Sequence, residues 1–325
     1  MIQKINFEFN DSDKVRKIAK KGLTTLLFVF IMVLLVGLSF LVLYPILTTV
    51  SLSFRPPKEM FDETVIWISK EPTLNNFINA LKELNYLSLV FKTLLVSLAC
   101  TAFSIISCSM AAYSLSRFNY RFKNVLFLLV VFTIVVPPQT AQIPTFISFR
   151  NFNFFGIGKI IGLLIGKDVT VNLLNTHWSL VLPSIFAAGL QAGLFIFIFR
   201  QFFLGMPKGL EEAAKIDGCN AMSTFIRIIV PNSVPVFVVV FLLSMVAYWN
   251  DTTVTGIYLF SEDSFLIMHK LSNIINTTMT TSYEFGEAEV LFGAMAVITI
   301  IPPIIIYAFC QTQFSEFLDR SGLKG

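Results

Sequence analysis

Six stretches of the chain contain no charged side chain, and each is long enough to cross a membrane. They are residues 22–54, 93–116, 124–149, 169–199, 228–250 and 290–315. A helix needs about 20 apolar residues to cross the hydrocarbon core of a bilayer. Because lipid offers the backbone no hydrogen-bonding partner, segments inside it are expected to be helical. The pattern therefore predicts an all-α polytopic membrane protein with six transmembrane helices, the first over residues 23–50.

The composition excludes other classes of protein. Of 325 residues, 55% are hydrophobic and 14% are charged, whereas soluble domains carry about 25% charged residues. A mean hydropathy of +0.75 excludes an intrinsically disordered chain. The length and number of the apolar stretches argue against an ordinary soluble enzyme.

Lysine and arginine are distributed unevenly between the predicted loops. If both termini are cytoplasmic, the segments on that side hold 15 of the 24 basic residues. Cytoplasmic loops of membrane proteins carry an excess of basic residues. We therefore predict a cytoplasmic N-terminal segment over residues 1–22 and a cytoplasmic tail over residues 313–325. These loops also explain the net charge of +4 without a nucleic-acid partner. Residues 23–50 are too long for the core of a signal peptide, which predicts a retained anchor.

The sequence offers no cluster of catalytic or metal-binding side chains. His177 and His269 stand alone on the predicted outer side, and we expect both to be structural. Residues 162–168 resemble a phosphate-binding loop. However, one residue is missing between its glycines, and Asp168 stands where a hydroxyl side chain is required. We therefore expect no metal or cofactor in this chain and no enzymatic activity.

Two pairs of prolines fall inside the apolar stretches, at Pro137–Pro138 and Pro302–Pro303. A proline inside a helix removes one backbone hydrogen bond and bends the helix. Such breaks occur beside the pathways of transporters. Membrane helices also tolerate proline more often than soluble helices do. The sequence leaves both interpretations open.

The longest predicted cytoplasmic loop, around residues 205–231, has the features of a short helix. Glu211 and Glu212 lie where the first turn of a helix favours acidic side chains. Ala213 and Ala214 follow and offer a bare face that another protein could approach closely. We therefore predict a helix that projects into the cytoplasm.

Asp217 and Gly218 predict the end of that helix, because glycine readily adopts the left-handed conformation. A second short helix is predicted over residues 221–229, and Pro231 is expected to stop it. The resulting helix–turn–helix is either a well-capped connector or a docking element for another protein. Its length favours docking, since a simple connector needs only a few residues.

The sequence Glu212-Ala213-Ala214-x-x-Asp217-Gly218, followed by Pro231, resembles the EAA loop of binding-protein-dependent ABC importer permeases. Further matches, in the family's order, are Ala111–Arg117, Pro137-x-Gln139, Trp249-Asn250-Asp251 and Ser321–Gly325. The resemblance extends from about residue 20 to the C-terminus. It points to the carbohydrate-uptake branch of the family. Within that branch, the chain resembles the smaller permease of maltose-type systems.

This resemblance implies a type I ABC importer permease architecture, with the permease core over residues 88–312. Such a chain lies among the lipids of the bacterial inner membrane and pairs with a second homologous permease. Two separate ATP-binding subunits supply the energy, and an extracytoplasmic binding protein delivers the sugar. Glu212 and its helix would enter a cleft of an ATPase subunit, and Gly218 would allow the turn there. The rest of the implied coupling surface is Glu211, Ala213, Ala214, Asp217 and Pro231.

The chain departs from the family pattern at three places. Cys219 stands where alanine is common, the outer loop over residues 150–176 is longer than usual, and residues 253–256 replace a leucine–proline pair. The size change at Cys219 is small. The other two departures leave the contact with a binding protein and the outer end of the fifth span open.

Tyr248, Trp249 and Asn250 end the fifth apolar stretch and form a candidate substrate pathway. Aromatic faces and an amide suit a hydroxylated ring, although aromatic residues also anchor helix ends at the membrane interface. A permease for another solute remains an alternative function. A secondary transporter would need ionisable groups at membrane depth, and the six stretches lack charged residues.

Overall fold

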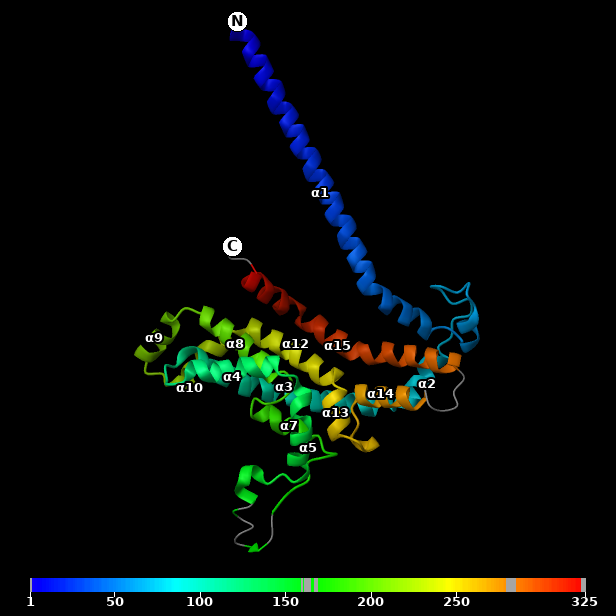
Figure 1. Cartoon of the computed structure of the whole chain (residues 1–325), viewed down its shortest axis with the longest axis vertical. Coiled ribbons are helices and arrows are strands. Elements are labelled where there is room, and N and C mark those ends of the chain that lie inside the picture. The colour runs from blue at the N-terminus through cyan, green and yellow to red at the C-terminus, as the bar shows by residue number, and fades with distance from the viewer. Residues whose placement is uncertain (1, 159, 161–164, 167–168, 279–284, 323–325) are drawn as a thin grey trace. The chain divides into compact units, whose positions relative to one another are not determined.

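The structure is a computed structural model that describes residues 2–158, 160, 165–166, 169–278 and 285–322. Residues 162–164, 167 and 168 of the rejected phosphate loop and residues 323–325 of the C-terminal match lie outside this part of the chain. Helices dominate the described residues, and their only β pairing is an isolated bridge between Phe152 and Val171 (Figure 1). The prediction of an all-α protein is confirmed.

The helices carry the labels of Figure 1. The α-helices are α1 (Ile2–Ser53), α2 (Asn75–Leu84), α3 (Tyr86–Arg117), α4 (Lys123–Val135), α5 (Gln142–Arg150), α7 (Trp178–Ile185), α8 (Ala192–Gly205), α9 (Gly209–Ile216), α10 (Ala221–Thr224), α11 (Val230–Asn232), α12 (Val234–Asn250), α13 (Thr253–Tyr258), α14 (Ile267–Thr278) and α15 (Phe285–Gly322). The shorter segments are the 3-10 helices η1 (Pro57–Phe61), η2 (Pro138–Ala141), η3 (Phe154–Gly156) and η5 (Glu262–Ser264), and the π-helical segment η4 (Phe225–Ile229).

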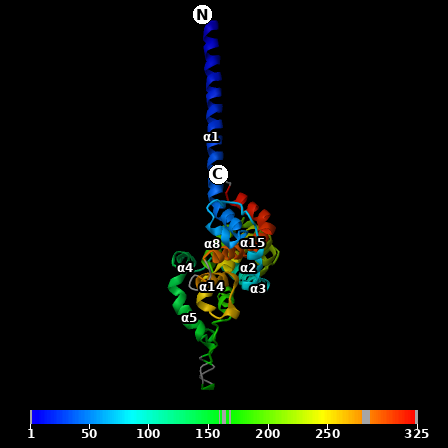
Figure 2. The same ribbon diagram turned by 90° about the vertical axis from the view of Figure 1, so that its right-hand side faces the viewer.

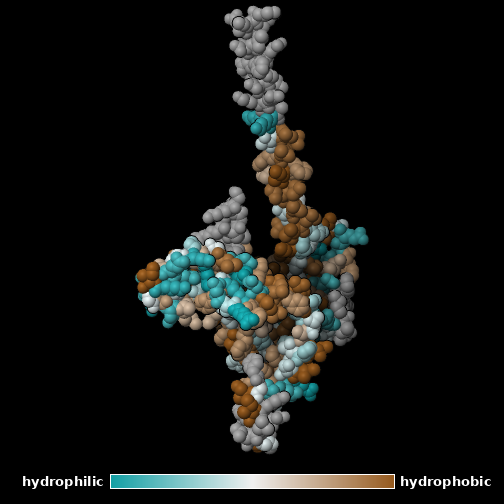
Figure 3. Space-filling view, turned by 60° about the vertical axis from the view of Figure 1, so that its left-hand side comes forward, coloured by the Kyte–Doolittle hydropathy of each residue, from teal (hydrophilic) through white to brown (hydrophobic). Residues whose placement is uncertain are grey.

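The chain divides into two compact units. The first comprises Met1–Asn76 with Phe285–Ala294, and the second comprises Phe77–Glu284 with Met295–Gly325. In the first unit, the stretch Lys20–Ser53 of α1 is long and apolar enough to cross a membrane. Its large hydrophobic side chains are exposed, and Figure 3 shows their apolar surface. The predicted transmembrane helix over residues 23–50 lies within this stretch.

Polar contacts order the segment that follows α1. The Glu59 carboxylate is buried and accepts hydrogen bonds from the Ser69 hydroxyl and the Glu71 backbone N–H, both at 2.8 Å. Lys70 donates to Asp62 at 2.5 Å. This hydrogen bond is the main cause that lowers the pKa of Asp62 to about 2, so the Asp62 carboxylate stays charged at neutral pH.

The second unit is built around α3, which packs against α7, α8 and α12. The buried face of α3 consists largely of small residues, which let neighbouring helices approach closely. These residues are Thr93, Ser97, Cys100, Thr101, Ser104, Cys108, Ser109, Ala112 and Ser116. One hydrophobic cluster joins the C-terminal half of α3 to α8, η4 and α12, and another joins its N-terminal half to α5, α7, α13 and the end of α12. The core of this unit therefore follows α3 along its length.

Within the described part of the chain, three helical segments are long and apolar enough to span a membrane, and up to six if each of three bent helix pairs forms one span. The pair formed by α4 and Pro138–Arg150 bends by 101°, a turn visible in Figure 2. The bend lies at Pro137–Pro138, where proline removes a backbone donor. In contrast, Pro302 and Pro303 lie within the continuous helix α15. Of the two proline pairs, only the first breaks its helix.

The fourth charge-free stretch is not the single helix expected from its length. It forms α7 and α8, separated by residues 186–191. Ala187 and Gln191 adopt positive φ angles of 53° and 56° in this interruption. Neither residue is glycine, so the sequence carried no strong signal for a left-handed backbone there. Tertiary contacts, described below, hold the interruption in place.

Candidate functional site

The predicted cytoplasmic loop forms a helix–turn–helix at one end of the second unit. Figure 1 shows α9 and α10 at that end, whereas α13 and α14 lie toward the other end of the same unit. Hydrophilic side chains gather over the α9 and α10 end in Figure 3. Helix α12 runs from this end toward α13. The length of α12 therefore separates the predicted cytoplasmic loop, with α9 and α10, from α13 and α14 on the predicted outer side.

Helix α9 begins and ends as the sequence predicted. Glu211 and Glu212 lie in its first turn. At its end, Gly218 has a φ of 81°, and its backbone N–H donates to the Lys215 carbonyl at 3.1 Å. The Cys219 N–H donates to the Ala214 carbonyl at 2.9 Å. These two bonds form a Schellman motif, the common glycine-dependent helix end.

The second helical segment starts directly after this turn. The Asn220 side chain caps α10 by accepting a hydrogen bond from the Ser223 N–H at 2.8 Å. The helix continues through η4 and α11, so it extends past the predicted end at Pro231 to Asn232. The π-helical turn η4 directly precedes α11, whose second residue, Pro231, has no N–H to donate.

The two glutamates of the first turn face different surroundings. Glu212 is exposed, as are Ala213, Asp217 and Gly218, while Ala214 is buried against the body of the protein. Glu211 turns inward, with only 14% of its side chain exposed. Within the predicted coupling surface, Glu212 is therefore accessible to a partner and Glu211 largely is not. Pro231 is exposed.

Glu211 pairs with Arg117, the last residue of α3. The Arg117 Nε and the Glu211 Oε1 lie 3.0 Å apart, and only 4% of the arginine side chain is exposed. The Arg117 Nη2 also donates to the carbonyls of Phe203 at 2.5 Å and Met206 at 2.9 Å, at the end of α8. This role of Arg117 was not predicted from the sequence. The one signal for it is that Arg117 is the first charged residue after a long apolar stretch.

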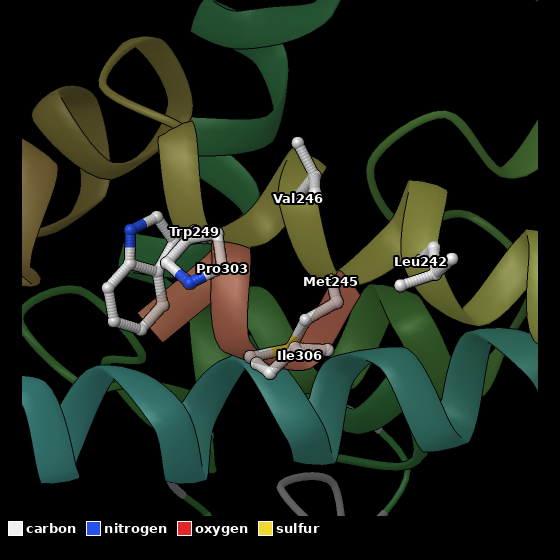
Figure 4. Close-up of a pocket in the computed structure, with 6 residues that line it drawn as sticks. All are labelled: Leu242, Met245, Val246, Trp249, Pro303 and Ile306. Atoms are coloured by element: carbon white, nitrogen blue, oxygen red, sulfur yellow. The ribbon is translucent and has the colours of Figure 1, made fainter. Parts of the chain in front are cut away.

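The candidate substrate-pathway residues are mostly inaccessible in this structure. Tyr248 and Trp249 are 2% and 1% exposed, whereas Asn250 is exposed. Trp249 lines a cavity of about 10 Å³, shown in Figure 4. That volume is at the lower limit for a single water molecule. The other lining residues are Leu242, Met245, Val246, Pro303 and Ile306. A role of Tyr248, Trp249 and Asn250 in substrate contact stays a prediction.

The Tyr248 hydroxyl instead holds the interruption between α7 and α8. It lies 2.7 Å from the Ser184 hydroxyl and accepts a hydrogen bond from the Leu190 N–H at 3.0 Å. Ser107 of α3 donates to the Ser184 carbonyl at 2.7 Å. Irregular backbone at membrane depth requires such internal partners, because lipid supplies none.

The two histidines lie in the part of the second unit near α13 and α14. His177 Nε2 is 3.1 Å from the Ser264 carbonyl, and burial is the main cause that lowers the pKa of His177. Burial likewise lowers the pKa of His269, against an opposing effect of Asp251. Both rings therefore favour the neutral form. The contact of His177 joins the segment before α7 to η5, in agreement with a structural role.

Comparison with known proteins places this geometry among membrane transport proteins. The profile of the family described as "binding-protein-dependent transport system inner membrane component" matches residues 104–319. The arabinooligosaccharides transport system permease protein AraQ of Halalkalibacterium halodurans is 28% identical over 89% of this chain and 93% of its own. The galactooligosaccharides transport system permease protein GanQ of Bacillus subtilis is 26% identical over 91% and 95%, respectively.

A solved structure shares the fold. It is the crystal structure of a bacterial ABC transporter involved in the import of the acidic polysaccharide alginate. The matched chain has a TM-score of 0.64 and 21% sequence identity, and the likeness covers 89% of this chain and 96% of the matched chain. The described helices thus follow the arrangement of a known transporter subunit.

Proposed function

Because the chain belongs to the family of binding-protein-dependent transport system inner membrane components, we propose that it is the permease subunit of an ATP-driven importer for a sugar or oligosaccharide. It provides half of the membrane pathway and hydrolyses no ATP itself. Two ATP-binding subunits drive the cycle, a second homologous permease completes the pathway, and an extracytoplasmic binding protein delivers the solute.

The observation that carries the proposal is the accessible helix–turn–helix of α9 and α10. Its exposed residues Glu212, Ala213, Asp217 and Gly218 lie together at one end of the second unit. Two small residues and a tight glycine turn allow close approach of a partner, and the acidic side chain can pair with a basic one. A docking surface of this kind supports energy supply by a separate subunit.

The names of the relatives support a carbohydrate as the solute. AraQ and GanQ are described as permeases for arabinooligosaccharides and galactooligosaccharides, and a third relative, from Bacillus subtilis, as a permease for polygalacturonan or rhamnogalacturonan. All of these solutes are oligomeric or polymeric carbohydrates. The proposed location is the bacterial cytoplasmic membrane, with six spans and both termini in the cytoplasm. In this arrangement, residues 1–22 and 313–325 are cytoplasmic segments and residues 88–312 form the permease core.

A transport assay tests the choice of solute. A strain that lacks this gene should lose uptake of one radiolabelled oligosaccharide from a panel of arabino-, galacto- and galacturono-oligosaccharides. Uptake should return with the gene and should require both ATP and the binding protein. Loss of uptake of an amino acid or ion instead would indicate a permease for another solute. Uptake that follows an ion gradient without ATP would indicate a secondary transporter.

Glu212→Lys is expected to abolish association with the ATPase subunits, with at least tenfold less ATPase in the purified complex. The substitution places a positive charge on the exposed first turn of α9, where the helix dipole also disfavours it. The measurement is co-purification from detergent, together with solute uptake in cells. Membrane insertion should be unchanged because Glu212 is exposed.

Glu262→Lys is the matched control for this substitution. Glu262 is an exposed glutamate in η5, at a distance in the fold from α9. Its charge reversal should leave ATPase association within twofold of the unchanged protein. Normal co-purification and uptake with Glu212→Lys would contradict the docking role of α9.

A further inference from the structure

We propose that Arg117 and Glu211 form an internal tether that transmits movement of α9 to α3 and α8. This inference rests on the proposed function, because it concerns how force from an ATPase reaches the membrane helices. It assigns Glu211 a role different from that of its neighbour Glu212. Glu212 faces the partner, whereas Glu211 holds the docking helix to the permease body.

The tether begins with the position of Arg117 at the end of α3. Its guanidinium faces the end of α8, where the helix leaves backbone carbonyls exposed to other donors. It donates to the carbonyl of Phe203, which also accepts the Met206 N–H, and to the carbonyl of Met206, the residue after α8. A cation near the end of a helix is also stabilised by the helix dipole. One side chain therefore joins the ends of two membrane helices.

The carbonyls at the end of α3 are bound by other basic residues. Arg200 Nε donates to the Leu115 carbonyl at 3.3 Å, and Lys123 Nζ donates to the Ser116 carbonyl at 3.0 Å. Arg200 also lies over the ring of Phe127, 3.7 Å from its centroid. These contacts leave the Arg117 guanidinium directed at α8 and α9 instead of at its own helix.

Glu211 supplies the connection to α9. Its Oε1 lies 3.0 Å from the Arg117 Nε, and neither atom has an aligned hydrogen bond within the described part of the chain. Charge attraction therefore holds this contact. The pair is nearly excluded from water, so removing one partner would leave a poorly solvated charge. Exposed ion pairs on a protein surface contribute little to stability. The Arg117–Glu211 pair differs from them because both side chains are largely buried.

The geometry gives a displacement of α9 two routes into the membrane part. One route follows the chain through α10, η4 and α11 into α12. The other passes through Glu211 and Arg117 into α3 and α8. Since α3 packs against α7, α8 and α12, the second route reaches the centre of the unit. Without the tether, α9 can still dock to a partner, but its movement is coupled to α12 alone.

The experiment compares neighbouring glutamates in the reconstituted complex of both permeases, the ATPase subunits and the cognate binding protein. Glu211→Gln and Arg117→Lys should retain ATPase association within twofold of the unchanged complex. Their ATPase stimulation by solute-loaded binding protein should fall at least fivefold. Arg117→Lys keeps a positive charge, but one ammonium group cannot contact Glu211, Phe203 and Met206 in the geometry of the guanidinium. Glu212→Lys should instead lose association.

The double variant Arg117→Gln/Glu211→Gln separates transmission from folding. It removes both charges, so no unpaired charge is left buried, and it should be purified in normal yield. Its ATPase stimulation should be as low as that of the single variants. Normal stimulation in the double variant would overturn the tether. Loss of association with Glu211→Gln would also overturn it, because that result would place Glu211 in the docking surface. If Glu212→Lys does not affect association, that result counts against the proposed function. The ATPase stimulation of the Glu211 and Arg117 variants would still test the tether by itself.

Discussion

Gly189→Ala is expected to reduce solute uptake at least tenfold, although the residue lies outside the docking loop. A methyl group built at this position would lie 2.3 Å from the Tyr248 hydroxyl and 2.9 Å from the Ser184 hydroxyl. It would also lie 3.1 Å from the Ser184 backbone. Such overpacking costs about 1–3 kcal/mol when the surroundings must shift. Here the groups that must shift hold a broken membrane segment.

The physical reason for the large effect is the role of Tyr248 in that segment. Its hydroxyl binds the Leu190 N–H, inside the interruption between α7 and α8. Displacing the hydroxyl would leave this partly buried donor without its partner, and the loss costs up to about 1–3 kcal/mol, the value for a fully buried group. Because Tyr248 lies on α12, which follows the docking loop, the same contact joins α12 to the α7–α8 interruption. The variant should therefore impair transport more than it impairs assembly.

Uptake of the labelled solute and ATPase co-purification provide the two measurements. Gly37→Ala is the control, because a methyl group there meets nothing within 4 Å. It should leave both measurements unchanged. Tyr248→Phe should also reduce uptake, and the double variant should lose less than the product of the two single losses, since both disturb one contact. Normal uptake with Gly189→Ala, or independent effects of the two substitutions, would contradict this account.

The parts of the structure that the sequence predicted are those with local causes. Acidic residues in a first turn and a glycine at a helix end act within a few residues, and they defined α9 and the turn at Gly218. Absence of charge over about 20 residues similarly predicts a membrane helix. The helix predicted over residues 23–50 follows from this rule alone.

The missed features depend on contacts between distant segments. Arg117 and Glu211 are far apart in sequence, and neither residue type alone indicates the other as its partner. Ala187 and Gln191 adopt left-handed conformations that their own side chains do not favour. Tyr248 was assigned to a candidate pathway on its chemistry, whereas its hydroxyl is bound within the fold. In each case, tertiary packing decides what local sequence leaves open.

Gly218→Val is expected to lower binding-protein-stimulated ATPase activity at least fivefold. Gly218 has a φ of 81° in the turn that ends α9. A β-branched residue is strained in this left-handed conformation, at a cost of about 1–3 kcal/mol. Since nothing lies within 4 Å of a methyl group at this site, the cost comes from the backbone. The turn would therefore open or shift, and the Schellman bonds to Lys215 and Ala214 would weaken.

Gly218→Asn separates this backbone effect from simple steric interference with the ATPase. Asparagine is similar in size to valine, but it tolerates the left-handed conformation far better. It should therefore retain most of the stimulation that valine loses. Gly209→Ala, at an open position in the first turn of the same helix, should retain full stimulation because alanine favours the helix. Equal losses with asparagine and valine would instead show that the partner needs space at this position, whatever the backbone conformation.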